Sequence, residues 1–524
     1  MAIDVTEYYS LFLIWLISTV GMHFLIKIWT NSLNKQKPRP PPGPPALPII
    51  GHLHLLSSTL PKSLETLANR YGPLMQIRMG DTLFVIVSDA NTAKKVLKTH
   101  DIDFASKYEP GPSQKLLYKG CSFINAPYSL YWRFMKKICV TKLFTSSQLL
   151  RFTHVREEER TKLLKSLIER SAAGEPCDLS KELEALTSLM IYRMTMGNRS
   201  SSLSSSEDYN YSVEAMEMRG LIRNIMECGK KYAVIEVFGP LRRFDLFGNG
   251  KRIEKAFLRY DQRLEQIIHE YEENRMNNII DGENEEKDVM DILLETCRDS
   301  SAEVTITKSH IKYFFMEIFM ASVDSTSTAM QSAMAELINR PEIFKKLREE
   351  INSVVGSNQL VKESDVPNLP YLQAVLKETL RLHPPGPMLR RTATVDSKIN
   401  GYDIKAGTKM FVNCYAIMRD PNVWKDPEKF MPERFLDCCD RVMDFKGQDF
   451  GYLPFGSGRR ACFGAPHAAY VIHATVAALV QCFDWKLEDG DKAGIDIVSG
   501  YTGAMAHPLV CYPSVNFEPF KGLD

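Results

Sequence analysis

The segment Phe455-Gly-Ser-Gly-Arg-Arg-Ala-Cys-Phe-Gly464 carries the strongest chemical signal in the 524-residue chain. It fits the pattern F-x-x-G-x-R-x-C-x-G at every fixed position. A cysteine thiolate that ligates iron needs backbone amides directed at its sulfur and close approach to a flat macrocycle, which Gly458 and Gly464 would permit. The alternative is a glycine turn before a helix that contains a buried cysteine. The complete pattern favours Cys462 as an iron ligand.

Two charged motifs lie upstream of this segment. Glu378-Thr-Leu-Arg381 places a glutamate and an arginine three residues apart, on one face of a helix. Pro432-Glu-Arg-Phe435 follows about fifty residues later. Any exposed helix can contain E-x-x-R by chance, so the first motif gains its weight from the second.

A long helix is expected further upstream, from about Thr307 to Ile338, closing at Asn339-Arg-Pro341. Its middle contains Ala321-Ser-Val-Asp-Ser-Thr326, where hydroxyl side chains adjoin an acid. Hydroxyls that bond back to helix carbonyls could open a groove for oxygen and water. A polar stripe facing solvent is the alternative, but the preceding run 314–320 is too apolar for a surface.

These motifs, in this order, resemble those of the cytochrome P450 family over nearly the whole chain. The resemblance implies a mainly α fold with a small β region, and haem b as the cofactor. Cys462 would be the axial ligand, whose electron donation favours O–O cleavage. Arg460 would pair with a haem propionate, and Phe455 and Gly464 would also contact the cofactor.

Three further cofactor contacts follow from the resemblance. Trp132 with Lys136 resembles W-x-x-x-R, in which the indole and the guanidinium contact a propionate. The lysine keeps the charge but loses the bidentate fork. Arg391 is another propionate candidate, with Arg390 competing for the same role.

The charged motifs gain a structural role from the same resemblance. In the family, Arg434 would join Glu378 and Arg381 in a buried network. Such a triad is weak evidence of net stability, but breaking it would strand a charge.

The segment 321–326 resembles the A-G-x-D-T-T oxygen-activation element of the family, with two departures. Ser322 replaces the usual glycine, and Ser325 replaces the usual threonine. Proton delivery needs a hydroxyl beside an acid in an otherwise apolar pocket, which makes Asp324, Ser325 and Thr326 the catalytic candidates. Whether Ser325 or Thr326 serves the proton path stays open.

The family encloses its substrate with five segments, which map here to 105–123, 219–237, 314–324, 386–389 and 499–505. Flexible methionines suit a bulky, poorly functionalised hydrocarbon, although such a stripe is more often plain core. The candidate walls are Phe319, Met320, Val323, Met388, Leu389 and Met505.

The proline-rich hinge, Ala126-Pro-Tyr128 and Leu369-Pro-Tyr371 resemble plant microsomal members of the family that oxidise specialised metabolites. The resemblance implies the oxidation of an apolar metabolite. The expected substrate is a triterpenoid, with a flavonoid or isoflavonoid as the alternative. Two other classes are an O2-independent haem-thiolate isomerase or dehydratase, and a non-catalytic haem sensor or lipid-binding protein. Neither would need the acid and hydroxyl of Asp324 and Ser325.

The electrons are expected from a partner, an NADPH-cytochrome P450 reductase, since the sequence has no flavin or dinucleotide fingerprint. Candidate docking charges are Lys136, Lys137, Lys425 and Lys429. The formal net charge of +1 gives no reason to expect nucleic acid as a partner. Eleven cysteines without paired spacing indicate reduced thiols.

The chain is expected to have an N-terminal anchor followed by one large domain. Tyr8 to Ile26 contains no charged residue, and basic residues follow it, so residues 1–30 are predicted to form a single transmembrane helix with the remainder in the cytosol. Residues 31–50 are predicted to be a basic, proline-rich hinge, and 51–524 the haem-binding monooxygenase domain. The predicted location is the endoplasmic reticulum membrane.

Other elements follow from periodicity and turn residues. Residues 74–79 and 83–87 predict a β-hairpin, and Asp89 begins a helix to about His100. Residues 157–169, 181–196 and 253–274 predict long surface-facing helices. Residues 198–208 and 238–251 predict loops.

Overall fold

The computed structural model describes Trp15, Ser18, Met22 and the ranges 39–107, 120–196, 205–236, 248–280, 287–356, 358–436, 443–488, 493–494 and 505–520. Apart from Trp15, Ser18 and Met22, the predicted anchor over 1–30 lies outside these residues, as do residues 31–38 of the predicted hinge. Among the described helices, none is both long and apolar enough to span a bilayer.

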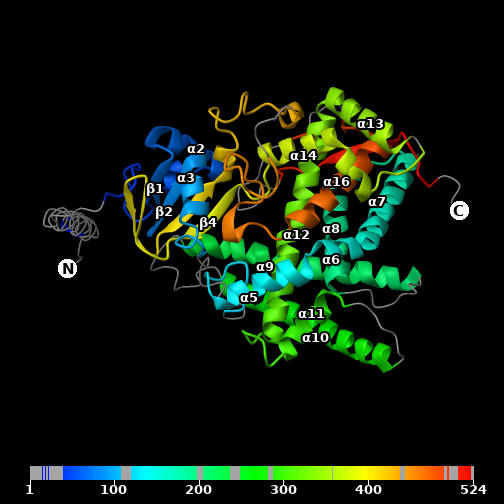
Figure 1. The fold of residues 1–524 in the computed structure, drawn as a ribbon, viewed down its shortest axis with the longest axis horizontal. Helices are drawn as coiled ribbons and strands as arrows, with labels where there is room; N and C mark the ends of the chain where they lie inside the picture. Colours follow the sequence, from blue (N-terminus) through cyan, green and yellow to red (C-terminus); the bar gives the residue numbers. More distant parts are fainter. Residues whose placement is uncertain are drawn as a thin grey trace, which may run out of the picture.

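The described chain is mainly helical, with its largest sheet at one end (Figure 1). The strands are β1 (Leu74–Met79), β2 (Thr82–Val87), β3 (Cys177–Asp178), β4 (Met388–Thr392), β5 (Ser397–Ile399), β6 (Tyr402–Ile404), β7 (Lys409–Asn413), β8 (Phe483–Lys486) and β9 (Val510–Val515). The helices are α2 (Leu60–Tyr71), α3 (Ala90–Lys94), α5 (Leu130–Ile138), α6 (Ser146–Arg151), α7 (Thr153–Ala173), α8 (Leu179–Met196), α9 (Ser205–Glu236), α10 (Asn249–Ile280), α11 (Val289–Arg298), α12 (Lys308–Ile338), α13 (Pro341–Val355), α14 (Pro370–Leu382), α15 (Cys414–Ile417) and α16 (Ala465–Cys482).

The largest sheet has the strand order β1-β2-β7-β4. β1 and β2 are antiparallel, β2 and β7 parallel, and β7 and β4 antiparallel. The register pairs Leu389 with Val412 and Arg391 with Met410. This pairing fixes the position of β4, which adjoins the site described below.

Helix α12 runs through the middle of the helical part (Figure 1). It is unbroken from Lys308 to Ile338 and most of its residues are buried. It packs on α8, α14 and α16, which carry apolar core residues from distant parts of the chain. The expected long helix is therefore confirmed, and its burial places the segment 321–326 inside the protein.

The predicted hairpin is confirmed as β1 and β2, and the side chain of Asp89 caps α3, whose helical path continues to Thr99. The prediction that 181–196 faces the surface is wrong. α8 is mostly buried, and its Arg193 is tolerated inside because Glu158 and Glu159 accept hydrogen bonds from it at 2.7 and 2.5 Å.

The C-terminal bounds of the two predicted loops, 198–208 and 238–251, are too late in the sequence. α9 begins at Ser205 and α10 at Asn249, so the last residues of each predicted loop are helical. The remainder, 198–204 and 238–247, lies outside the described residues.

The described end of the predicted hinge packs against the domain. The amide of Arg39 donates to the side-chain carboxylate of Asp403 at 2.7 Å, and the amide of Asp403 donates to the carbonyl of Arg39 at 2.8 Å. The amide of Gln76 in β1 donates to the carbonyl of Pro42 at 2.7 Å. A side chain at position 43 would collide with the backbone of Gln76, because a Cβ atom on Gly43 would lie 2.1 Å from the carbonyl oxygen of Gln76. The proline-rich segment therefore lies directly on the sheet.

Candidate active site

The cysteine segment forms a tight loop between the sheet end and α16. The amide of Cys462 donates to the carbonyl of Phe455 at 3.0 Å, and the amide of Ala461 donates to Gly458 at 3.0 Å. Gly458 has a φ of +72°, and a Cβ there would lie 2.3 Å from the carbonyl oxygen of Leu97. Only glycine fits this position, since it combines a left-handed backbone with close approach.

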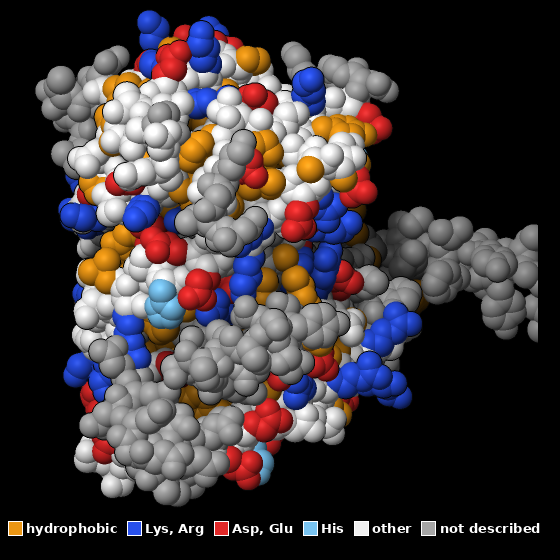
Figure 2. Space-filling model, turned by 90° about the vertical axis from the view of Figure 1, so that its right-hand side faces the viewer, with side chains coloured by type: hydrophobic (Ala, Val, Ile, Leu, Met, Phe, Trp, Pro, Cys, Tyr) orange, Lys and Arg blue, Asp and Glu red, His pale blue; other side chains and the backbone are white. Residues whose placement is uncertain are grey.

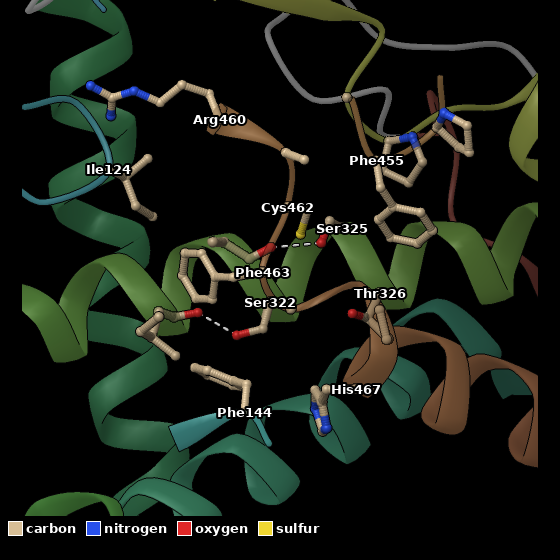
Figure 3. Close-up of a pocket in the computed structure, with 18 of the residues that line it drawn as sticks. Ile124, Phe144, Ser322, Ser325, Thr326, Phe455, Arg460, Cys462, Phe463 and His467 are labelled. Carbon is tan, nitrogen blue, oxygen red and sulfur yellow. Dashed lines mark hydrogen bonds between the residues drawn. The ribbon is translucent and has the colours of Figure 1, made fainter. Parts of the chain in front are cut away.

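Cys462 opens into a cavity of about 310 Å³. Figure 3 shows Cys462 and Phe463 of this loop together with Ser322, Ser325 and Thr326 of α12, and all five residues line the cavity. The lining also includes Phe123, Ile124, Trp132, Phe144, Ile191, Ile318, Ala321, Leu389, Phe455 and His467. Most of these side chains are apolar, so a ligand in the cavity is shielded from bulk water.

Opposing effects act on the Cys462 thiol. Burial raises its pKa, while the backbone amides of Gly464 and Ala465 and the charges of Lys136 and Lys107 lower it. Amides and cations directed at sulfur favour the thiolate form. Burial is the largest of these effects and leaves the pKa of the Cys462 thiol raised, while the loop directs amides and cations at a sulfur that is placed to ligate a metal.

Buried cations surround the same cavity. The guanidinium of Arg460 lies 4.1 Å from the centre of the Trp132 ring and donates to the carbonyls of Ala105 and Ala126. Burial, together with the charge of nearby Arg391, lowers the pKa of Arg460 to about 9. Burial likewise lowers the pKa of Arg391 to about 10. Two like charges thus lie close together inside the protein.

Within the described residues, Nη1 of Arg460 and Nε of Arg391 are buried without a hydrogen-bond partner. Burial and the charges of Arg390, Arg391 and Arg460 also lower the pKa of Lys107, which lines the cavity. Buried cations with unused donors need anionic partners. The two propionates of haem b meet that need, so these residues fit the cofactor.

Lys136 is turned inward. Its ammonium donates to the carbonyl of Ala461 at 3.1 Å and lies 5.2 Å from the centre of the Phe463 ring. It therefore belongs to the cavity, whereas the other predicted docking lysines, Lys137, Lys425 and Lys429, are exposed. Basic and acidic side chains are interspersed on the face in Figure 2.

The structure brings the three predicted network residues together. Arg381 donates twice to Glu378, at 2.7 and 2.9 Å, and Arg434 donates to the same carboxylate at 3.0 Å. Glu378 and Arg381 are fully buried. The carbonyls of Met418, Pro427 and Lys429 accept the remaining Arg381 hydrogens at 2.8, 2.7 and 3.2 Å. Every charge in this network therefore has partners.

Helix α12 separates two cavities. Ile318, Ala321, Ser322, Ser325, Thr326 and Ala329 line the cavity of Cys462. Phe319, Met320, Val323 and Asp324 line a second cavity of about 180 Å³, together with Glu184 and Arg219, which form an ion pair. Ser325 and Thr326 therefore lie on the Cys462 side, while the predicted acid Asp324 lies on the other side.

Hydroxyls of the segment bond back to the helix, as the sequence indicated. Ser325 donates to the carbonyl of Ala321 at 2.6 Å, and Ser322 donates to Ile318. Both hydroxyls still face the cavity (Figure 3). Each can accept a hydrogen bond from a ligand or water there.

The other predicted walls are divided. Leu389 lines the Cys462 cavity, but Met388 packs beneath the sheet with Phe84 and Phe411. Met505 packs at the edge of the core around α16. Residues 108–119, 237 and 499–504 of the predicted enclosing segments lie outside the described residues.

Sequence reasoning missed several lining residues. The helical spacing of 318, 322, 325 and 329 could have shown which face of α12 meets the cavity. Phe144 and His467 gave no such signal, whereas Lys107 lies in the predicted enclosing segment 105–123. His467 is buried on α16, where burial lowers its pKa to about 3, so it lines the cavity as a neutral imidazole.

Comparison with known proteins agrees with this site. The cytochrome P450 family model matches residues 41–507. Soybean (Glycine max) cytochrome P450 93A2 and 3,9-dihydroxypterocarpan 6A-monooxygenase are each 39% identical over 98% of this chain and 99% of their own. Soybean beta-amyrin 24-hydroxylase is 39% identical over 99% of both chains. A zebra fish cytochrome P450 solved with abiraterone has a TM-score of 0.71 at 25% identity, covering 88% of this chain and 100% of that one.

Fold and site together define a haem-thiolate oxidoreductase. The chain belongs to the cytochrome P450 family. It is a monooxygenase of plant specialised metabolism that acts on a small apolar substrate, with haem b as cofactor and electrons from NADPH through a reductase. When bound, the haem supplies the iron at which dioxygen is reduced.

Proposed function

We propose that this protein hydroxylates, or further oxidises, a triterpenoid. The observation that carries the proposal is the apolar lining on the α12 side of the Cys462 cavity, where Ile318 and Ala321 lie beside Ile124 and Leu389. Two of the hydroxyls there, on Ser322 and Ser325, donate to their own helix. Few polar groups remain to recognise a densely functionalised ligand, which favours a hydrocarbon skeleton.

The relatives point to two substrate classes, and the sequence identity to this chain is the same for both. One is named for hydroxylation of beta-amyrin and another for oxidation of a pterocarpan, each at 39%. A flavonoid or isoflavonoid is therefore the second candidate. The lining favours the triterpenoid, because a buried phenol leaves unsatisfied polar groups unless the pocket supplies partners.

The proposed roles follow the positions of the side chains. Cys462 would hold the iron, and Arg460, Arg391, Trp132, Lys136 and Lys107 would hold the propionate side. Ser325 or Thr326 would pass protons into the cavity, with Asp324 connected from the second cavity. We also propose the N-terminal membrane anchor over 1–30, the hinge over 31–50, and a cytosol-facing domain on the endoplasmic reticulum.

Product analysis tests the substrate class. Microsomes containing this protein and a plant reductase would be incubated with NADPH and either beta-amyrin and related triterpenes or a panel of flavanones and pterocarpans. Mass spectrometry should detect oxygenated triterpenes. Oxidation of the flavanones or pterocarpans alone would reject the triterpenoid proposal. Extraction of the microsomes with carbonate tests the anchor separately, since a spanning protein stays with the membrane.

A further inference from the structure

Glu317 is a buried carboxylate on α12, one turn before Ala321, and lies outside the motifs that carry the chemistry. Only 5% of its surface is exposed. It accepts hydrogen bonds from the hydroxyl of Ser122 at 2.5 Å and from the amides of Phe123 and Ile124 at 2.8 and 3.0 Å. These donors belong to a segment almost two hundred residues away in sequence.

The segment that Glu317 holds forms part of the cavity wall. Phe123 and Ile124 both line the Cys462 cavity. The Phe123 ring lies 5.6 Å from Phe463, the neighbour of Cys462, and 6.3 Å from Trp132. A shift of this segment would therefore change the cavity on two sides.

The same segment is connected to two other elements. The Ser122 hydroxyl accepts from the amide of Asn125 at 3.2 Å, and the side chain of Asn125 accepts from Arg390 of β4 at 2.9 Å. The carbonyl of Ala126 accepts from Arg460. Residues 122–126 thus bridge α12, β4 and the cysteine loop, and Glu317 supplies the α12 connection.

Burying a carboxylate costs free energy, because the charged group loses its contacts with water. Burial raises the pKa of Glu317, its three hydrogen bonds and the charge of Lys107 offset part of this rise, and the resulting pKa is about 7. If only packing were needed, an apolar residue of similar volume would be neutral or more stable. A carboxylate that accepts from two consecutive amides instead fixes their direction.

We propose that Glu317 is a positioning residue that holds Phe123 and Ile124 in the cavity wall and so sets which bulky ligands the cavity accepts. It does not touch the reacting atoms. The inference stands on the wall geometry, and is independent of whether the natural substrate is a triterpenoid.

Two azole probes of different size test this role through their difference spectra on the reconstituted haem protein. Imidazole reports access to the iron, and clotrimazole additionally requires the wall. In Glu317→Gln, clotrimazole binding should weaken roughly tenfold, because an amide cannot accept at both terminal atoms. Imidazole binding should change less than about twofold, with the thiolate carbon-monoxide band retained.

Matched variants complete the test. Glu350→Gln is the control, because Glu350 also accepts two consecutive amides, from Tyr371 and Leu372, but lies outside the lining of the cavity. It should leave both azoles unchanged. Ser122→Ala removes one donor and should weaken clotrimazole alone by about threefold. This milder variant decides the matter if Glu317→Gln does not fold.

Three results would overturn the proposal: equal weakening of both azoles, no change in either, or an unchanged clotrimazole affinity in Ser122→Ala. The first would indicate a general role in the haem pocket. The second and third would show that packing alone holds the wall.

Discussion

The two sides of the cavity are held in place by different means. On the cysteine side, the loop 455–464 is fixed by its own backbone hydrogen bonds and by the left-handed Gly458. In the neighbouring wall, residues 122–124 depend on Glu317 of α12, which is almost two hundred residues away in sequence. A locally determined side can be conserved as a motif, while a side determined by distant contacts can vary with the ligand.

Replacement of Cys462 breaks the cysteine side completely and has the largest expected effect. Cys462→Ser should abolish the carbon-monoxide band typical of a thiolate-ligated haem, together with all NADPH-dependent turnover, because the hydroxyl is a much poorer iron donor. Reduced carbon-monoxide spectra with haem quantification measure this. The control is Cys297→Ser, which replaces another free cysteine on α11 and should behave like the wild type. A retained thiolate band in Cys462→Ser would mean that another cysteine ligates the iron.

The same difference explains how far the sequence could predict the molecule. The cysteine loop, the hairpin and α12 were predictable, because adjacent residues or a helical period determine them. The burial of α8 was not, since it depends on pairing Arg193 with Glu158 and Glu159 of another helix. Glu317 looked like one acid in an apolar run, and only the fold shows that it meets Ser122.

The position of Asp324 shows the same limit within one helix. The motif placed Asp324 and Ser325 side by side in sequence, and adjacent residues on a helix point about 100° apart. The cavity of Cys462 receives Ser325, and the second cavity receives Asp324. Which of the two faces meets the cysteine is decided by the packing of α8 and α16 on α12.

Breaking the buried ion network should have the next largest effect. Glu378→Ala strands Arg381 and removes an acceptor from Arg434, so we expect a loss of about 3–5 kcal/mol in unfolding free energy. Chemical denaturation followed by haem absorbance and circular dichroism measures it. The control is Lys346→Ala, which removes an exposed pair with Glu433 and should cost less than about 1 kcal/mol. Equal effects of the two variants would contradict a structural role for the network.

The protonation of Glu317 gives a pH-dependent test of the wall that α12 holds in place. Burial raises the pKa of Glu317 from its ordinary 4.5 to about 7. The folded state therefore binds this proton more tightly than the unfolded state, and Glu317 lowers stability as the pH rises through this window, by up to about 3 kcal/mol. The Tm of Glu317→Gln, measured against that of the wild type, should accordingly rise from about pH 5 to pH 7. A Glu317→Gln curve that runs parallel to the wild-type curve over this pH range would refute the buried titration of Glu317.

Removing the Ser325 hydroxyl should have the smallest effect, because Thr326 lines the same cavity. Ser325→Ala should lower the fraction of NADPH electrons found in product by several-fold, less than about tenfold, and release hydrogen peroxide instead, since proton delivery becomes slower. Parallel assays of NADPH, peroxide and product measure this coupling. Ser327→Ala is the matched control, because the Ser327 hydroxyl bonds to the carbonyl of Asp324 at 3.2 Å and the residue lines the second cavity. Unchanged coupling in Ser325→Ala with a loss in Thr326→Ala would assign the proton path to the threonine. Loss in Ser327→Ala alone would instead place the path in the second cavity, beside Asp324.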